Sequence, residues 1–150
     1  MIADTLATLK LHFHRANAAF DEVQQFADVL SVAMLDDYEK VKVLDSFILR
    51  FIKIQDLMGH KLFRELLDSV GEYELSMSML DVLDRLEKLG FIKSAERWLD
   101  YRNLRNILTH EYPDSQKEMI EGIQMAMSAF VEVRETYSKM AAYVEQRGLV

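Results

Sequence analysis

The sequence predicts an all-α protein, an up-and-down bundle of about five helices in one domain covering residues 1–150. Half of the 150 residues are hydrophobic, which is enough to bury a core. The chain has one proline and five glycines, far fewer than the turns of a β-sheet protein require. Its apolar residues recur at spacings of three, four and seven, the period of a helical face. No repeat or low-complexity tract marks a second domain.

The first two helices are predicted over residues 4–30 and 36–70. Asp36 and Glu39 have the spacing of a capping box at the start of the second helix, and Gly71 ends it. This second helix has the densest apolar set, so we expect it to be central. The first helix shows a regular apolar face at Leu6, Leu9, Phe13, Phe20, Val23, Phe26 and Leu30.

A polar loop over residues 71–76 separates these helices from three more. Ser78 and Asp81 form a second capping-box pattern and open a short helix that ends at Gly90. The fourth helix is expected to begin at Ser94 and to end at Pro113, because the residue before a proline avoids helical geometry. The last helix is predicted from Ser115, which has Glu118 three residues later, to about Arg147.

Charge and composition exclude several classes of function. The formal net charge is −7, the opposite sign to that of a protein that coats DNA or long RNA, because binding to phosphates dominates such affinity. The chain has no cysteine and therefore no disulfide or thiolate metal site. It shows neither a signal-peptide pattern nor an apolar run of the roughly 20 residues that span a bilayer. We expect a cytoplasmic protein that binds neither membrane nor DNA.

The fourth helix has one polar edge that stands out. Arg102, Asn106 and His110 are spaced four apart and rise along this edge, with Arg105 and Thr109 beside them. The opposite side of the helix is apolar, so the helix is expected to be buried on one face only. The apolar side consists of Trp98, Tyr101, Leu104, Ile107 and Leu108.

These side chains could cleave RNA without a metal. The planar guanidinium of Arg105 matches a phosphate, and His110 can both accept and donate a proton near neutral pH. A base would remove the proton of the 2′-hydroxyl, arginine would hold the charge of the phosphorane, and an acid would protonate the leaving oxygen. A polar helix face that is merely solvated is the alternative interpretation.

The spacing of Arg105 and His110 bears on how such a site could be built. Five residues along a helix place two side chains about 140° apart and roughly 7.5 Å apart along the axis. One helix therefore could hardly direct both at one atom. The spacing suggests a site shared between two copies of the chain.

Residues 101–112, which read YRNLRNILTHEY, resemble the Arg-x4-His-x-Tyr signature of HEPN-domain proteins of the HepT type. That family is similar to the nucleotidyltransferase substrate-binding subunits. The resemblance implies a HEPN-like helical bundle, a homodimer whose two signature segments face each other, and a metal-independent endoribonuclease toxin. It also implies a partner, a minimal nucleotidyltransferase antitoxin that uses ATP, whereas this chain would need no cofactor.

The resemblance assigns roles to individual residues of this sequence. Arg105 would hold the scissile phosphate, His110 would act as general acid or base, and Asn106 would help to orient the phosphate. Tyr112 would be the hydroxyl that the partner modifies with adenylate, which blocks the cleft. Given the acidic chain, RNA binding would depend on a small basic patch of Arg97, Arg102 and Arg105.

A polar pair, Gln55 and Asp56, interrupts the apolar run of the second helix. Such a pair can support a neighbouring site by hydrogen bonding, and here it could reach the polar edge of the fourth helix, where Arg102 and Thr109 would add further support. A simple position at the edge of the second helix is the alternative.

Two other functions remain open at this level. The chain could be a non-catalytic helical subunit that docks a nucleotidyltransferase and presents substrate or nucleotide to it. It could also be a purely structural helical dimer. A metal site is not expected, because His12 and His14 point in different directions on a helix and His60 lacks a second ligand at helical spacing.

Overall fold

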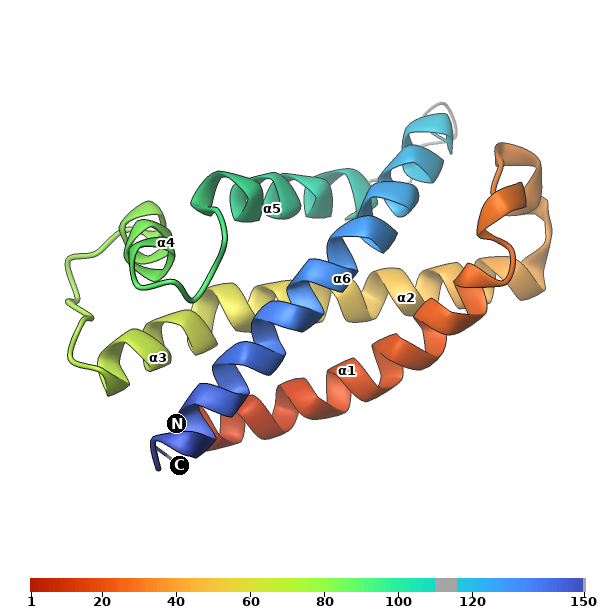
Figure 1. The fold of residues 1–150 in the computed structure, drawn as a ribbon. Helices are drawn as coiled ribbons and strands as arrows, with labels where there is room; N and C mark the ends of the chain where they lie inside the picture. Colours follow the sequence, from red (N-terminus) through yellow and green to blue (C-terminus); the bar gives the residue numbers. More distant parts are fainter. Residues whose placement is uncertain (110–115, 150) are drawn as a thin grey trace.

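The computed structural model describes residues 1–109 and 116–149. In these two ranges every regular element is a helix, which confirms the predicted all-α bundle (Figure 1). The elements are α1 (Ile2–Gln24), η1 (Ala27–Val29), η2 (Val32–Asp36), α2 (Tyr38–Leu57), η3 (Met58–Leu62), α3 (Phe63–Ser69), α4 (Met79–Lys88), α5 (Ala95–Thr109) and α6 (Gln116–Gln146).

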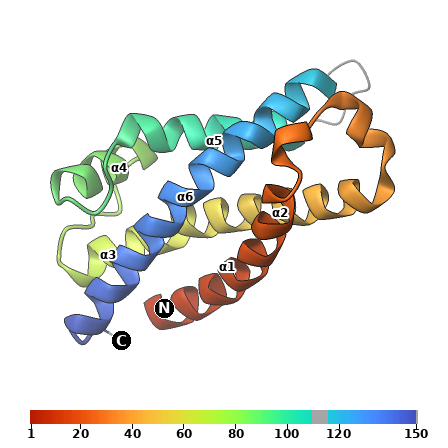
Figure 2. The ribbon, with the colours of Figure 1, turned by 45° about the vertical axis from the view of Figure 1, so that its right-hand side comes forward.

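Two long helical segments form one layer, and the remaining helices cover it. α1 runs antiparallel to the segment made by α2, η3 and α3, and these two pack most extensively against each other. α6 crosses this pair obliquely, while α5 lies along α2 on the side away from α1 (Figures 1 and 2). α4 lies across one end, and the chain starts and finishes close together at that same end.

One continuous hydrophobic cluster joins the helices. It extends from Ile2 to Val144, and its centre is a group of phenylalanine rings. The ring centroid of Phe130 on α6 lies 5.1 Å from that of Phe20 on α1 and 5.6 Å from that of Phe47 on α2. Packed aromatic rings of this kind stabilise a core beyond the area that they bury, so Phe130 holds α6 where it crosses α1 and α2.

The second predicted helix is confirmed in extent but is not uniform. Residues 38–69 are continuously helical, with a π-helical turn, Met58–Leu62, between α2 and α3. Gly59 lies in this turn, and a Cβ there would make ordinary van der Waals contact, at 3.8 Å, with the side chains of Trp98 and Met79. On either side of this turn, α2 packs against α5 and α3 packs against α4.

Two predicted helix boundaries are wrong. α1 ends at Gln24 rather than near Leu30, because the backbone leaves the helix at Phe26 and makes two 3₁₀ turns on its way back to α2. The apolar spacing continues to Leu30 because this connection also packs against the core. α2 is capped by Asp37, not Asp36, since the Asp37 carboxylate accepts hydrogen bonds from the next backbone N–H groups.

The other helix starts agree with the sequence where the structure describes them. Ser78 and Asp81 form the predicted capping box, and Ser94 Oγ accepts a hydrogen bond from the backbone N–H of Arg97. Gly90 ends α4 with a φ of 82°, a conformation that favours glycine. The predicted cap at Ser115 lies outside the described residues.

α5 is held against α6 at both ends. Near its start, Glu132 of α6 accepts hydrogen bonds from Arg97 and from the hydroxyl of Tyr101. Near its end, α6 approaches so closely at Gly122 that a Cβ there would lie 3.0 Å from Cγ2 of Ile107. These contacts fix α5 against α6, and its remaining sides face α2 and the solvent.

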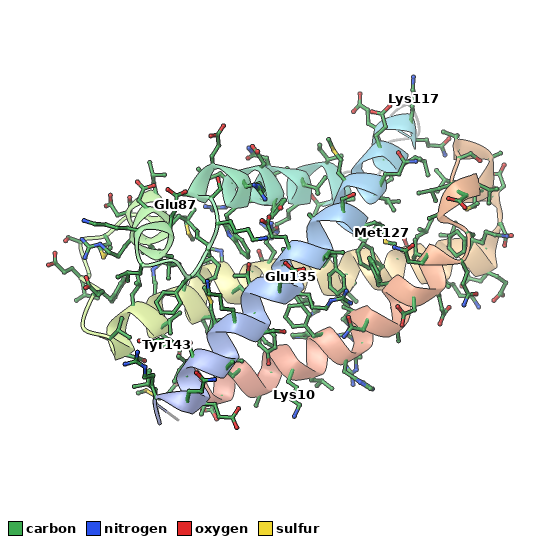
Figure 3. All side chains as sticks on the ribbon, in the orientation of Figure 1. Lys10, Glu87, Lys117, Met127, Glu135 and Tyr143 are labelled. Atoms are coloured by element: carbon green, nitrogen blue, oxygen red, sulfur yellow. The ribbon has the colours of Figure 1, made fainter. Side chains whose placement is uncertain are left out.

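In the part of the chain that the structure describes, none of the helices combines the length and the hydropathy required to cross a bilayer. The side chains drawn in Figure 3 include exposed charged groups and buried apolar groups. Charged groups such as Lys10 and Lys117 project outward, whereas Met127 on α6 is buried among the helices.

Candidate functional site

The edge of α5 that faces α2 carries the first residue of the signature. Nε of Arg105 lies 3.1 Å from Oδ1 of Asp56 on α2, and each side chain is 37% exposed. Asp56 therefore reaches the polar edge of α5, the contact that the sequence suggested. The ion pair fixes the position of Arg105 at the surface of the bundle, between two helices that the core holds in place.

The hydrogen-bonding groups of Arg105 are nevertheless largely unused. Nε is buried, yet its N–H is not directed at the carboxylate and has no hydrogen-bond partner. No other hydrogen bond joins this guanidinium to a residue that the structure describes. Asp56 thus attracts Arg105 through charge, and no described residue takes the terminal amino groups, Nη1 and Nη2, through which a planar guanidinium can bind a phosphate.

Gln55 lies next to Asp56 but points into the bundle. The residue is only 3% exposed, and neither Nε2 nor Oε1 of its carboxamide has a hydrogen-bond partner among the described side chains and backbone groups. A buried amide without a partner is destabilising by roughly 1–3 kcal/mol. The structure thus places Gln55 beneath the Arg105–Asp56 pair without showing a contact between Gln55 and that pair.

The other predicted residues of α5 are at the surface. Arg102, Asn106 and Thr109 are all exposed, and they lie within two turns of Arg105. The Thr109 hydroxyl donates to the backbone carbonyl of Asn106 at 3.1 Å, as a serine or threonine near a helix end often does. These three side chains lie along the polar edge of α5, and those of Arg102 and Asn106 are exposed to solvent.

Two residues of the predicted site, His110 and Tyr112, lie outside the described residues. α5 is described as far as Thr109, so the helix carrying Arg105 leads directly to His110. The predicted end of this helix at Pro113 also lies outside the described residues.

The expected basic patch on α5 is smaller than the sequence indicated. Arg97 forms an ion pair in which its Nη1 lies 2.6 Å from Oε1 of Glu132 on α6, and Arg105 forms an ion pair with Asp56. Only Arg102 of the three is exposed without an ion pair to a described residue. Two of the three charges are neutralised by carboxylates that come from other helices, which the local sequence could not reveal.

The same Glu132 shifts the ionisation of Tyr101. Burial, together with the hydrogen bond to the Glu132 carboxylate, raises the pKa of Tyr101 to about 12. This hydroxyl stays protonated at neutral pH and belongs to the α5–α6 contact. It lies one helical turn before Arg105, but its partner is Glu132 of α6, whereas Arg105 pairs with Asp56 of α2.

Sequence reasoning missed a group of basic residues between α1 and α2. Nη1 of Arg50 lies 3.1 Å from Nδ1 of His12, and arginine can only donate, so the neutral ring carries its proton on Nε2. Burial, followed by Arg50, Lys53 and Arg15, lowers the pKa of His12. The spacing of three residues within each pair, 12 with 15 and 50 with 53, was a signal, but it acquires meaning only when the two helices are placed side by side.

Within the described ranges, no three histidine or acidic side chains come together as they would at a metal centre. Comparisons of the chain with models of protein families, with curated proteins and with solved structures found no match. The functional interpretation therefore rests on the signature segment and on the geometry around Arg105.

Proposed function

We propose that this chain is the toxin of a HEPN/minimal-nucleotidyltransferase pair, an endoribonuclease that cleaves RNA without a metal. The observation that carries the proposal is Arg105, which Asp56 positions at the surface and whose guanidinium makes no hydrogen bond to a described residue. Its place five residues before His110 and seven before Tyr112 matches the signature of the HepT type. An all-helical bundle of this size is consistent with that family.

In the proposed reaction the 2′-oxygen attacks the adjacent phosphorus. His110 of one copy accepts the proton of the 2′-hydroxyl and then donates a proton to the 5′-oxygen that leaves, beside Arg105 of the second copy. Arg105 stabilises the charge of the phosphorane, and Asn106 helps to orient the phosphate. The bond to the 5′-oxygen breaks, which leaves a 2′,3′-cyclic phosphate on one product and a 5′-hydroxyl on the other.

Purified protein and defined RNA provide the main test. Wild type is expected to yield fragments with cyclic-phosphate ends in the presence of EDTA, and His110→Ala is expected to remove this activity. His14→Ala is a matched control, because His14 is exposed on α1, a helix remote from the signature. Cleavage by His110→Ala at the wild-type rate would exclude His110 from the mechanism.

Mixing two inactive variants tests whether the site is shared in a homodimer. Arg105→Ala and His110→Ala would each be inactive alone, but a mixed dimer would contain one complete site. Random exchange of subunits is then expected to restore about one quarter of the wild-type activity. If the two variants exchange subunits and no activity returns, each copy of the chain must contain its own complete site.

Neutralisation is proposed to occur by adenylylation of Tyr112. Its phenolic oxygen would attack the α-phosphorus of ATP on the partner nucleotidyltransferase, releasing pyrophosphate. Co-expression with the minimal nucleotidyltransferase of the proposed pair should increase the intact mass in adenylate steps, and Tyr112→Phe should prevent this increase. An unchanged mass for wild type would contradict this part of the proposal.

A non-catalytic subunit is the second candidate, and one observation favours it. Asp56 partly neutralises Arg105, and the chain as a whole has a net charge of −7, so the local attraction for a polyanion is weakened. This candidate predicts a stable complex with a nucleotidyltransferase and no RNA cleavage by the isolated chain. The cleavage assay therefore separates the two.

A further inference from the structure

Two hollows lie along the contact between α1 and α2, and no described residue of α6 lines either of them. We call the strip of surface that contains both hollows the α1/α2 groove. One hollow, of about 480 Å³, lies near the start of α1 and has Thr8, His60, Lys61 and Arg64 among its walls. The other, of about 370 Å³, lies between the second half of α1 and the first half of α2.

Positive charge is concentrated along this groove. Six of the chain's 18 lysines and arginines line or border it, together with His12 and His60, although the chain as a whole is acidic. The positive charge is therefore a property of this groove and not of the chain as a whole. The six residues are Arg15, Lys42, Arg50, Lys53, Lys61 and Arg64.

Four acidic residues line the two hollows, Asp4, Glu22, Glu39 and Glu65, and all but Glu22 have a partner among the described residues; Asp4 lies 3.4 Å from the amino terminus. Glu39 pairs with Lys42, while Glu65 accepts a hydrogen bond from Thr5 and lies 3.9 Å from the amino terminus. Nη1 of Arg50, which lines the second hollow, lies 3.1 Å from Nδ1 of His12, and neither Arg50 nor Lys53 forms an ion pair with a described carboxylate. The described residues therefore leave the charges of Arg50 and Lys53 without a carboxylate partner.

The pKa of His12 responds to the positive charge of this groove. Its ring lies among Arg50, Lys53 and Arg15, whose charges, after burial, are the factors that lower its pKa. Like charges held together in a native structure are destabilising unless something binds them. Folding has gathered these groups from two helices although the chain contains 25 acidic residues that could have balanced them.

The shape and chemistry of the groove fit one kind of ligand. Arginine guanidinium groups match phosphate geometry, and both Arg15 and Arg50 are among the walls. From Lys42 to Arg64 the basic residues extend for about 33 Å along the helix axis. Charges repeated along a narrow linear path match a repeating phosphodiester chain rather than a single small anion.

The groove is also adjacent to the candidate site. Lys53 and Asp56 are three residues apart on α2, so they are neighbours on the surface of one helix, and Asp56 holds Arg105. We propose that the α1/α2 groove binds the backbone of single-stranded RNA and leads it toward Arg105. The choice of RNA rests on the proposed function, whereas the positive groove itself does not.

Binding of a non-cleavable oligonucleotide tests the inference directly. A labelled 2′-O-methyl oligouridylate would be titrated with wild type and with Arg15→Gln/Arg50→Gln/Lys53→Gln, following fluorescence anisotropy. Loss of three phosphate contacts should reduce the slope of log K against log salt by about 2, which corresponds to about 100-fold weaker binding at 0.1 M salt. Equal affinities for the two proteins would overturn the inference, as would a wild type that does not bind.

A matched variant controls for net charge. Lys10→Gln/Lys88→Gln/Lys93→Gln removes the same three charges, and these lysines are exposed and lie away from the groove; Lys10 projects from the far side of α1 (Figure 3). It should bind the oligonucleotide nearly as wild type does. If it loses as much affinity as the groove variant, only the overall charge matters and the groove is not a binding site.

Cleavage of a dinucleotide, which is too short to occupy the groove, separates this inference from the proposed function. The groove variant should cleave the dinucleotide as wild type does but should show a raised KM for long RNA. Equal loss on both substrates would overturn the inference. If wild type binds RNA through the groove but cleaves neither substrate, the groove stands and the nuclease proposal fails.

Discussion

Arg105 contacts α2 from α5 and Arg50 belongs to α2 itself, yet the two charges have opposite surroundings. Arg105 faces the carboxylate of Asp56, whereas Arg50 faces the imidazole of His12 with further cations around it. The first arrangement holds one guanidinium in a defined place, as a reacting centre requires. The second leaves positive charge unbalanced along a groove, as a surface for a polyanion requires. Arg105 is thus suited to position a reacting group, and Arg50 is suited to attract a polyanion.

The largest effect is expected at Arg105. Arg105→Gln should reduce RNA cleavage by about 100- to 1000-fold, because it removes the group proposed to stabilise the charge of the phosphorane. The melting temperature should change little, since the side chain is at the surface and water screens its ion pair. Cleavage rates on a dinucleotide and on long RNA would measure the effect.

Arg147→Gln is the control for this change, since Arg147 is exposed at the far end of α6. It should cleave both substrates at the wild-type rate. If Arg105→Gln raises only the KM for long RNA, then Arg105 acts as Arg50 does, by attraction, and the contrast between them disappears.

The buried carboxamide of Gln55 should have the next largest effect, this time on stability. Gln55→Leu should raise the free energy of unfolding by about 1–2 kcal/mol, because it replaces a buried amide without a hydrogen-bond partner by an apolar group of similar size. Urea denaturation measures the change. If Gln55 also supports Arg105, the same variant will be more stable and less active.

Thr5→Val is the matched opposite case. Thr5 is also buried, but its hydroxyl donates to Glu65 at 2.6 Å, so its loss should destabilise the protein by about 0.5–1.5 kcal/mol. Destabilisation by Gln55→Leu of the same size would mean that the Gln55 amide has a partner in the folded protein.

Asp56→Asn should have a smaller effect. The variant keeps the shape of the side chain but removes the charge that draws Arg105 into place. Stability should fall by less than about 1 kcal/mol, because each partner is 37% exposed and solvent screens the pair. Cleavage should fall by about tenfold or less, since the guanidinium remains but is less well positioned.

Asp84→Asn, which removes an exposed carboxylate on α4, away from the groove and from Arg105, should leave cleavage unchanged. An increase in RNA cleavage by Asp56→Asn would show that Asp56 restrains Arg105 rather than positions it. That result would favour the non-catalytic interpretation of the wild-type chain.

The smallest effect concerns His12. Arg50→Gln should raise the pKa of His12 toward its ordinary value, because it removes the nearest positive charge while burial continues to lower it. NMR titration of the ring protons measures the shift. A lowered histidine pKa contributes stability above the unfolded value of about 6.5 that is lost as the pH falls, so Arg50→Gln should also reduce acid sensitivity in this window.

Arg134→Gln provides the control, because Arg134 hydrogen-bonds to Asn17 and is not among the charges that shift His12. An unchanged His12 pKa in Arg50→Gln would mean that burial alone causes the shift. The evidence for an uncompensated positive groove would then be weaker.

Fold class and most helix starts could be predicted because they depend on local patterns. The apolar period of α2 and α6 and the capping box at Ser78 act within a few residues of one another. The end of α1 could not be predicted, since no glycine or proline marks it and apolar Leu30 continues the helical spacing into the connection. The shift from Asp36 to Asp37 as cap is equally invisible when two aspartates are adjacent.

The candidate site divides in the same way. The sequence was sufficient to single out Arg105, Asn106, His110 and Tyr112, because their chemistry and spacing lie within one segment. Only the tertiary structure determines which arginines have a carboxylate partner and which do not. Glu132 and Asp56 come from other helices to neutralise Arg97 and Arg105, while α1 and α2 bring His12, Arg15, Arg50 and Lys53 together. Helix formation is local, but electrostatic potential depends on every charge within reach, whichever part of the chain supplies it.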